Sequence, residues 1–470
     1  MEFFARRRTA PHGSRVGSTY DIPVDSLTPT QLQDEKAALT LQAHQSYGTV
    51  KPPPFTVWEV HEGVLSVPRF YGLKRYGTPE VDERSLGQAL PASLAFAGTL
   101  SETQTEASRT VLGRHLRPDG IGGTMICLPC GLGKTVLAVF LAVTLGRRTV
   151  VLVHKAVIRD QWIAAFEKFC PGARVGVVQG GTDWQTDGYD VVIAMVLTLA
   201  KREQTDTQLF DWAGTVVVDE CHHMAARVMN RAMRWFRARY IIALTADKER
   251  ADGMTPLLHH ILGPEGYRAE RKGTESVRVS IATYEDPGLH EKLSHDGKPL
   301  MSLMLNQIAN NPRRNAFIAD RVAKMRAAGR VVLVLSDRLR QLETLNAMLR
   351  ERGVAPDDIG IFCGSTKESD RQEQLGRGVV LCSYAMANEG VDKREADTCV
   401  MATPKGRVIQ CIGRVQRPCE NKKAPLVIDI ADQLSIFTSM RWKRQKMYRN
   451  ENYEVQVLPA LTTADDAWFA

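Results

Sequence analysis

The sequence lacks any apolar run of about 20 residues, the length that a membrane-spanning helix needs, and it lacks a secretory signal at its start. It also lacks a disulfide pattern, because its nine cysteines are odd in number and scattered along the 470 residues. These absences argue against a membrane protein and against a secreted domain held by disulfides. We therefore expect a reduced, intracellular protein, with nucleus, cytoplasm and virion all compatible.

A second C-x-x-C pair is also missing. Cys127 and Cys130 form such a pair, but a closed zinc site needs four ligands. The histidine doublets at 222–223 and 259–260 lie far away in the sequence. We expect the two cysteines to line an apolar junction between a strand and a loop, with a zinc site as the weaker alternative.

Acidic residues are in deficit: 61 lysines and arginines face 53 aspartates and glutamates, a formal net charge of +8. This excess favours an anionic partner and is compatible with nucleic acid, although it is a weak signal by itself. The first residues, "MEFFARRRTAPHGSRVGS", predict a disordered basic arm. A mitochondrial transit peptide is the alternative, against which Glu2 and Asp21 argue.

The chain is long enough for two or three domains. Its first 90 or so residues mix prolines with short β-rich pieces and predict a small, irregular accessory region. From about residue 100, short β-branched runs such as "RTVVLVH" and "GTVVVDE" alternate with helical patterns, and the alternation starts again after about residue 270. Such alternation is typical of α/β domains with a parallel sheet buried on both faces.

Two of the predicted helices are easily read. "GKTVLAVFLAVTLG" is apolar and ends at Gly146, a good helix C-terminus. "IRDQWIAAFEKFC" places Trp162, Phe166 and Phe169 on one face, which predicts a helix packed on the core.

The loop between a predicted strand and that first helix reads "LPCGLGKT". The phosphate-loop pattern asks for glycine where this chain has Leu128, but the strand–loop–helix setting is the one that a phosphate loop requires. Backbone N–H groups and the helix N-terminus bind phosphates there, and Gly131 and Gly133 permit close backbone approach. Lys134 is then the candidate to neutralise the β- and γ-phosphates, and Thr135 to ligate Mg²⁺.

A second candidate is "VVVDECHHM", in which an apolar strand ends in two acids. A Mg²⁺ ion on a triphosphate needs a carboxylate at such a strand end, and Asp219 fits this role. Glu220 is the candidate to position or deprotonate the attacking water.

Taken together, "LPCGLGKT", "VVVDECHH" and "LTADKERADGMTPLLHHILGP" resemble the motifs of superfamily 2 helicases. "VLVHKAVIRDQW", "GVVLCSYAMANEGVD", "QCIGRVQRP" and "LSETQTEA" add further motifs in the expected order, over about residues 95 to 432. In that superfamily the first loop glycine is often absent, so Leu128 is no objection. The DECHH box and the stretch "KERADGM…LGP" most resemble the branch holding the poxvirus transcript-release helicase, related helicases of large DNA viruses and the xeroderma B-type repair helicase.

The resemblance implies an α/β fold of two tandem RecA-like domains, with ATP in the cleft between them and nucleic acid across both. ATP and Mg²⁺ are the implied cofactors, with Mg²⁺ held by Thr135 and Asp219. The residues implied to bind ATP are Gln104, which reads adenine, and Pro129, Cys130, Gly131, Leu132, Gly133, Lys134, Thr135, Gly390 and Asp392. The residues implied to act in hydrolysis are Lys134, Asp219, Glu220, Gln410, Arg414 and Arg417, the two arginines as arginine fingers.

The resemblance also implies contacts to nucleic acid by Lys155, Ser336, Arg338, Lys367, Arg371 and Ser383. The segment "RWKRQKMYRN" alternates basic and aromatic residues, as a strand-stacking groove does, although a solvated helix face fits equally well. The motif that couples hydrolysis to strand separation is Thr245, Ala246 and Asp247, where an aspartate replaces the usual last hydroxyl. This departure makes unwinding a weaker expectation than hydrolysis.

We therefore expect an N-terminal arm and accessory region over residues 1–94, RecA-like domains over 95–270 and 271–455, and a tail over 456–470. The expected function is an ATP-dependent helicase or translocase, acting on DNA, with no membrane partner. The alternatives are an RNA helicase or transcript-releasing ATPase associated with transcription or replication machinery, and a nucleic-acid-binding scaffold with a dead ATPase. The intact Lys134, Asp219, Glu220, Arg414 and Arg417 argue against the scaffold.

Overall fold

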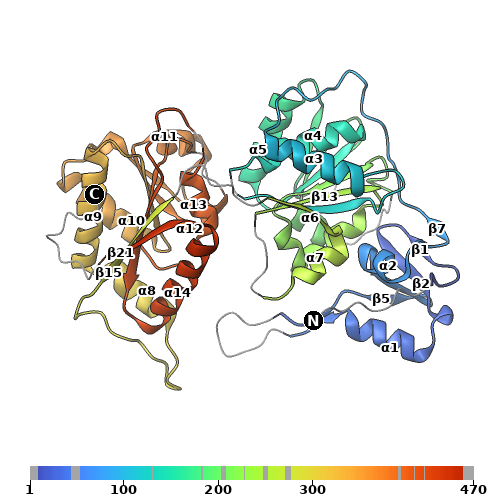
Figure 1. The fold of residues 1–470 in the computed structure, drawn as a ribbon, viewed down its shortest axis with the longest axis horizontal. Coiled ribbons are helices and arrows are strands. Elements are labelled where there is room, and N and C mark those ends of the chain that lie inside the picture. Colours follow the sequence, from blue (N-terminus) through green and yellow to red (C-terminus); the bar gives the residue numbers. More distant parts are fainter. Residues whose placement is uncertain are drawn as a thin grey trace. The chain divides into compact units, whose positions relative to one another are not determined.

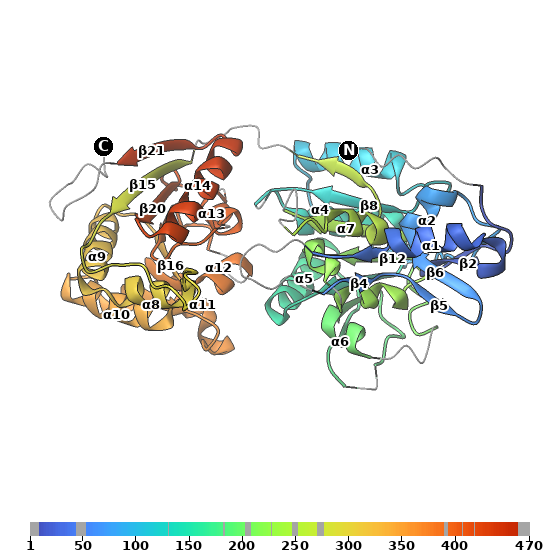
Figure 2. The same cartoon turned by 90° about the horizontal axis from the view of Figure 1, so that it is seen from below.

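The computed structural model divides the chain into two compact units, Met1–Glu270 and Arg271–Ala470 (Figure 1). The residues that it describes are 9–43, 53–129, 131–181, 184–202, 208–226, 228–246, 252–269, 277–389, 393–406, 408–417 and 419–458. Each unit contains a parallel sheet of seven strands with helices on both faces (Figures 1 and 2). This arrangement confirms the α/β class that the alternating pattern predicted.

The N-terminal region is more regular than the sequence indicated. Five strands form a mixed sheet in the order β5-β6-β2-β1-β7, and β3 pairs with β4. The bounds are β1 Arg15–Val16, β2 Thr19–Pro23, β3 Thr40–Leu41, β4 Phe55–Thr56, β5 Glu59–His61, β6 Val64–Pro68, β7 Val81–Asp82, α1 Pro29–Ala38 and α2 Arg69–Tyr76. Strands of two to five residues are too short for an apolar–polar alternation to stand out in the sequence.

This small sheet is joined to the rest of the first unit. Arg69, at the start of α2, is buried and donates hydrogen bonds to the carbonyls of Phe236 (2.6 Å) and Ala238 (2.8 Å). The ring of Tyr71 lies edge-on against His260. Apolar side chains of both parts also belong to one buried cluster. The accessory region therefore shares a hydrophobic core with the sheet that follows it.

The first large sheet has the strand order β10-β11-β9-β12-β13-β8-β14, and all its neighbours are parallel. Alternate residues of β12 enter different cores: Val216 and Val218 lie on one face and Val217 on the other. Both faces are covered, so the strands read as continuous apolar runs. The bounds are β8 Gly123–Cys127, β9 Thr149–Val153, β10 Val175–Val178, β11 Val191–Met195, β12 Thr215–Val218, β13 Tyr240–Thr245, β14 Glu265–Arg268, α3 Glu102–Arg114, α4 Lys134–Leu145, α5 Ala156–Phe169, α6 Val196–Lys201 and α7 Thr255–Leu262. The 3-10 helices Cys221–Ala225 and Met229–Trp235 follow β12.

The second large sheet has the order β17-β18-β16-β19-β20-β15-β21, again parallel throughout. Its strands are β15 Arg278–Tyr284, β16 Val332–Ser336, β17 Ile359–Phe362, β18 Val379–Ser383, β19 Thr398–Met401, β20 Leu426–Asp432 and β21 Glu454–Leu458. Its helices are α8 Met301–Asn310, α9 Pro312–Ala327, α10 Leu339–Glu351, α11 Arg371–Gly376, α12 Tyr384–Glu389, α13 Ile409–Val415 and α14 Ser435–Asn450. The short 3-10 helix Glu368–Asp370 precedes α11.

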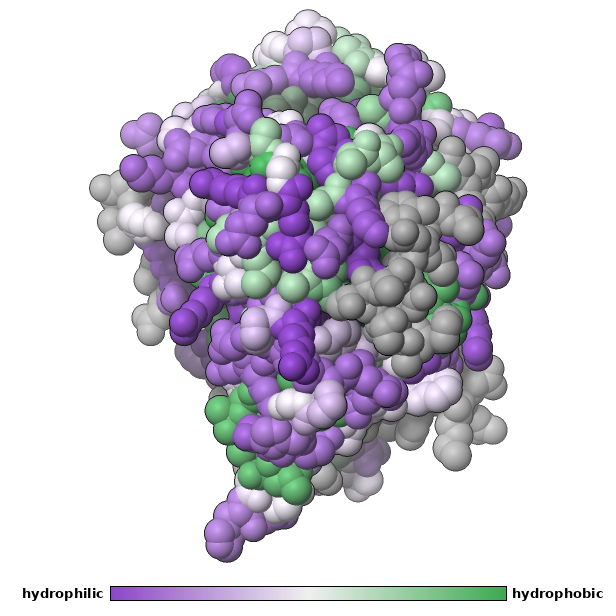
Figure 3. Space-filling model, turned by 90° about the vertical axis from the view of Figure 1, so that its left-hand side faces the viewer, coloured by the Kyte–Doolittle hydropathy of each residue, from purple (hydrophilic) through white to green (hydrophobic). Residues whose placement is uncertain are grey.

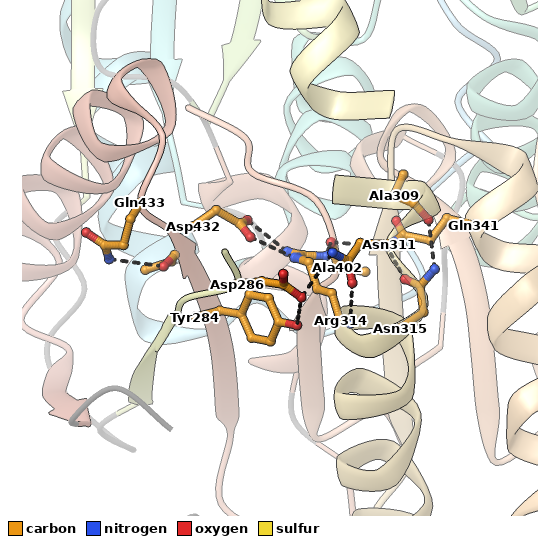
Figure 4. A network of polar contacts seen from close by, with 11 residues as sticks. Tyr284, Asp286, Ala309, Asn311, Arg314, Asn315, Gln341, Ala402, Asp432 and Gln433 are labelled. Atoms are coloured by element: carbon orange, nitrogen blue, oxygen red, sulfur yellow. Dashed lines mark hydrogen bonds and ion pairs between the residues drawn. The ribbon is translucent and has the colours of Figure 1, made fainter. Parts of the chain in front are cut away.

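A buried polar network links α9 to the end of β20 and to α10 in this second unit (Figure 4). Arg314, on α9, has no exposed side-chain surface and makes a two-pronged ion pair with Asp432 at the end of β20 (2.7 and 2.9 Å). Its remaining terminal nitrogen donates to the carbonyl of Ala402 (2.6 Å). Farther along, Gln341 donates to Asn315 (2.9 Å). Because burying an unpaired guanidinium is costly, Asp432 and the Ala402 carbonyl are what make Arg314 tolerable in the core.

The surface is mainly hydrophilic on the side drawn in Figure 3, where apolar side chains occur in separate small areas. Among the described residues, no helix is both long enough and apolar enough to cross a membrane.

Candidate nucleotide site

The predicted phosphate loop lies between β8, whose five residues are all buried, and α4. Gly131 (φ 90°) and Gly133 (φ 72°) both have left-handed backbones, which residues with a β-carbon rarely adopt. A β-carbon at Gly133 would also lie 2.3 Å from the Nε2 atom of Gln104. The backbone conformation therefore favours glycine at this position, and a β-carbon there would also displace the amide of Gln104.

Gln104 is tied to the loop by its side chain. Its amide nitrogen donates to the carbonyls of Leu132 (3.2 Å) and Gly133 (3.0 Å), and its amide oxygen accepts from the backbone N–H of Ser101 (2.8 Å). In this conformation the amide of Gln104 braces the loop and the start of α3. The sequence assigned it to adenine recognition, and that role stays a prediction.

Lys134 and Thr135 open α4, and the two acids follow β12. Parallel strands bring their carboxyl ends to one edge of the sheet, and ligands of such folds bind outside that edge. The Nζ atom of Lys134 lies 3.8 Å from Oε1 of Glu220, and the two side chains are 12% and 18% exposed. The backbone N–H of Leu128 donates to the carbonyl of Thr245 (3.0 Å), so the predicted coupling motif starts beside the loop. Lys134, Glu220 and Thr245 therefore lie at one edge of one unit.

The carboxylate of Asp219 is held on both oxygens. The indole N–H of Trp162, from α5, donates to Oδ2 (2.8 Å), and the backbone N–H of Glu220 donates to Oδ1 (2.9 Å). Burial and then the charge of Glu220 raise the pKa of Asp219, while these two donors and Lys134 oppose the rise.

Glu220 has a left-handed backbone (φ 44°), unusual for a residue with a side chain. The side chain meets Lys134 on one oxygen and His222 on the other, whose Nδ1 lies 3.3 Å from Oε2. Burial acts to raise the pKa of Glu220, but Lys134 and His222 outweigh it and hold the pKa below its usual range. Glu220 is therefore an ionised carboxylate at neutral pH, paired with the ammonium group of Lys134.

The sequence analysis did not predict two features of this site. Trp162 was assigned to a packing face, and it is indeed buried, but its indole also orients Asp219. A buried tryptophan needs an acceptor for its N–H, and that requirement was the available signal. The second feature is a row of imidazoles: the ring of His223 lies 4.1 Å from that of His154 and 4.2 Å from that of His222, centroid to centroid.

The oxygen donors at this edge suit Mg²⁺, which prefers one or two protein oxygens together with water and phosphate oxygens over an all-protein cage. The described residues contain no group of three or more His, Cys, Asp or Glu that could hold a metal ion by themselves. Cys127 is a buried thiol, and burial raises its pKa to about 12. Cys130, its predicted partner, lies outside the described residues.

The predicted site residues of the second unit differ from one another in environment. Arg414, on α13, is 9% exposed, and its Nε donates to the carbonyl of Ala387 on α12 (3.0 Å). Arg417, just after α13, is partly exposed, and its carbonyl accepts from Lys422 (2.7 Å). Gln410 is also partly exposed. Gly390 and Asp392 lie outside the described residues.

The residues predicted to contact nucleic acid also differ from one another in burial and in their contacts. Ser336 is fully buried, and its hydroxyl donates to Gln341 (2.7 Å) and accepts from the backbone N–H of Arg338 (2.9 Å), so it shapes the turn that carries Arg338. Arg338 contacts Asn306 (2.5 Å) and Ser302. The remaining members are exposed or partly exposed: Lys155 at the start of α5, Ser383 at the end of β18, and Lys367 and Arg371 before and in α11. Of the coupling motif, Thr245 is buried, Ala246 is partly exposed, and Asp247 lies outside the described residues.

Comparison with known proteins adds to this geometry. Residues 98–250 match the family model described as "Type III restriction enzyme, res subunit". A putative ATP-dependent RNA helicase of Acanthamoeba polyphaga mimivirus is 28% identical over 413 residues, covering 87% of this chain and 78% of the relative. A probable helicase of Escherichia phage T5 is 28% identical over 333 residues, covering 69% and 71%.

Among solved structures, a fragment of a putative HsdR subunit of a type I restriction enzyme from Vibrio vulnificus YJ016 superposes with a TM-score of 0.58 at 15% identity, covering 77% of this chain and 69% of that one. At that identity the likeness concerns the fold, two tandem RecA-like domains. Together the comparisons show that this chain is similar to superfamily 2 helicases, which are NTPases, with relatives among the helicases of large DNA viruses.

Proposed function

We propose that this protein is an ATP-dependent helicase or translocase that acts on DNA and hydrolyses ATP at the edge of the first large sheet. The observation that carries the proposal is the grouping of a glycine loop with left-handed backbone, Lys134, Asp219 and Glu220 at the carboxyl ends of parallel strands. The name of the mimivirus relative favours a second candidate, an RNA helicase. We also propose that the protein is related to the branch that holds the transcript-release and xeroderma B-type helicases.

In the proposed mechanism, the N–H groups of the loop and the first turn of α4 bind the phosphates. Thr135 and Asp219 would supply oxygen ligands to Mg²⁺, which when bound neutralises charge on the β- and γ-phosphates. Trp162 and the backbone of Glu220 keep the Asp219 carboxylate in one orientation. Such outer partners matter because they fix the geometry of the ligand.

In the proposed mechanism, Lys134 changes its ionic partner from Glu220 to the nucleotide when ATP binds. A γ-phosphate attracts Lys134 away from Glu220, since phosphate carries the greater negative charge. Glu220 then loses the cation that holds its pKa low, and becomes a stronger base towards a neighbouring water. We propose that Glu220 orients this water and accepts its proton once Lys134 has turned to the nucleotide.

The two arginines of the second unit are assigned different roles. Arg414 is nearly buried and bonded to α12, so we propose that it holds α12 against α13. Arg417 is the better candidate for contact with the γ-phosphate, whose charge in the transition state suits a guanidinium. Gln410, Gly390 and Asp392 stay proposed members of the same set.

For nucleic acid we propose phosphate contacts by Lys155, Arg338, Lys367, Arg371 and Ser383, with Ser336 acting through Arg338. A motor that steps along any sequence has to hold phosphates and not base edges. Coupling through Thr245, Ala246 and Asp247 belongs to the same proposal. Transcription or replication machinery is the proposed setting.

The test compares ATP turnover with single-stranded DNA, duplex DNA and RNA, each at about 50 and 200 mM salt. We expect turnover to rise with nucleic acid and the affinity to fall steeply with salt, by about two orders of magnitude if four to six phosphates are held. Preference for DNA would support the first candidate, and preference for RNA the second. If no nucleic acid raises turnover at low salt, the motor function is refuted even when ATP is hydrolysed.

A further inference from the structure

The helix α14 contains the basic and aromatic segment that the sequence left between two interpretations. Its inner side is buried: Phe437 and Met440 belong to a cluster with side chains of α8, and Tyr448 belongs to a core cluster of the second sheet. Arg444 makes a two-pronged ion pair with Asp429 of β20 (2.7 Å to each oxygen), and the hydroxyl of Tyr448 donates to the same carboxylate (2.8 Å). One cation and one aromatic ring of the segment therefore serve the core.

The outer side of α14 is different. Trp442 is 61% exposed, more than any other large apolar side chain in the described part of the chain. Lys446 and Arg449 are exposed four and seven residues after it, at spacings of four and three residues that share one helix face, and the exposed Lys443 lies at the border of this face, three residues before Lys446. The 16 residues of α14 contain no acid. With Arg444 neutralised by Asp429, the helix keeps its other four cations at or near the surface.

This surface, formed by Trp442, Lys443, Lys446 and Arg449 and called here the α14 surface, combines two kinds of binding group. Cations alone would suit any polyanion, duplex included. An exposed indole among them adds a flat face on which an unpaired base can stack, which is how proteins hold single strands without regard to sequence. The guanidinium of Arg441, 6.0 Å from the Trp442 ring centroid, adds positive charge at the ring. From Trp442 to Arg449 the face extends about 10 Å along the helix.

We propose that the α14 surface is a binding site for single-stranded nucleic acid, with a base stacked on Trp442 and phosphates held by Lys443, Lys446 and Arg449. The site lies outside all the helicase motifs. It rests on the proposed function, because it requires that the protein binds nucleic acid.

The first experiment measures binding of a fluorescently labelled thymidine oligomer of about 20 nucleotides, without ATP. Trp442→Ala is expected to weaken binding by about 5- to 150-fold, the range for loss of one base stack. Trp442→Phe retains a ring and should restore most of the affinity. The matched control is Leu303→Ala on α8, which removes another exposed apolar side chain (51% exposed) and should bind as the unaltered protein does. Unfolding midpoints establish that the variants are folded.

The second experiment separates stacking from charge. An oligomer of the same length without bases should bind Trp442→Ala and the unaltered protein equally, because there is nothing to stack. On the intact oligomer, the double substitution Lys446→Ala and Arg449→Ala should reduce the slope of log K against log salt by about 1.4, or 0.7 for each phosphate contact. Lys324→Ala, on α9 of the same unit, is the control and should leave the slope unchanged.

The results distinguish two failures. If the unaltered protein binds no oligomer and no nucleic acid raises its ATP turnover, the proposed function itself is refuted. If it binds and its ATP turnover is stimulated, but Trp442→Ala binds the thymidine oligomer normally, the proposal that the α14 surface binds single strands is refuted. The proposed motor function then stands. Equal weakening of Trp442→Ala on the intact and base-free oligomers would also overturn the stacking assignment.

Discussion

The indole of Trp162 offers the sharpest test of the nucleotide site, because its hydrogen bond orients the Asp219 carboxylate from a different element, α5. Trp162→Phe keeps an aromatic ring in the core but removes the donor 2.8 Å from Oδ2. Asp219 then keeps the backbone N–H of Glu220 on its other oxygen and becomes free to rotate about that contact.

The expected loss can be estimated from this geometry. A hydrogen bond to a charged group contributes about 1.5–3 kcal/mol. Partners that orient a metal-binding carboxylate typically account for about 10- to 100-fold in metal affinity or activity, or about 1.4–2.7 kcal/mol. The two ranges agree, so we expect Trp162→Phe to raise the Mg²⁺ concentration for half-maximal ATP turnover, or to lower kcat, by about tenfold or more.

The assay is stimulated ATP turnover as a function of Mg²⁺ at fixed ATP. Phe166→Leu is the matched control, since Phe166 is equally buried on the same face of α5 and makes no bond to Asp219. Any loss that both variants share comes from packing. If Trp162→Phe requires no more Mg²⁺ and turns over no more slowly than Phe166→Leu, the indole does not position the carboxylate.

Three other predictions concern single side chains. Lys134→Ala should impair productive ATP binding, whereas Glu220→Gln should bind ATP but hydrolyse it very slowly. Normal ATP turnover by both variants would refute the assignment of these two residues to the nucleotide site. Arg417→Ala should lower kcat by roughly 10³-fold or more with ATP affinity nearly unchanged, and an unaltered kcat would show that this arginine does not meet the γ-phosphate. Asp432→Ala leaves the buried guanidinium of Arg314 without its carboxylate and should lower the free energy of unfolding by about 3–5 kcal/mol; a urea midpoint equal to that of the unaltered protein would contradict the role of this ion pair.

The sequence determined those features that depend on neighbours along the chain. The glycine loop, the apolar strand before it and the helix after it are consecutive residues, so their order alone predicted a loop at a strand end, and the structure has β8, the loop and α4 in that order. The buried strands could be predicted for the same reason. Once each strand end carries its acids or its loop, parallel pairing brings them to one edge of the sheet.

The N-terminal sheet could not be predicted in this way. Its strands have two to five residues, and what stabilises them is pairing between segments far apart, as between Arg15 and Val81. Contact with the first large unit, through Arg69 and the carbonyls of Phe236 and Ala238, adds to this. Neither kind of contact leaves a local pattern.

Only the tertiary structure decided which polar side chains are already engaged. In the sequence, Arg414 and Arg417 are two equivalent members of one motif, and Arg444 and Trp442 are neighbours in one basic segment. Folding binds Arg414 to Ala387 and Arg444 to Asp429, residues distant along the chain, and leaves Trp442 exposed. The physical reason is that a charged side chain is buried only where another group pairs with it or accepts its hydrogen bonds. The position of that group depends on how strands and helices pack and not on the residues on either side in the sequence.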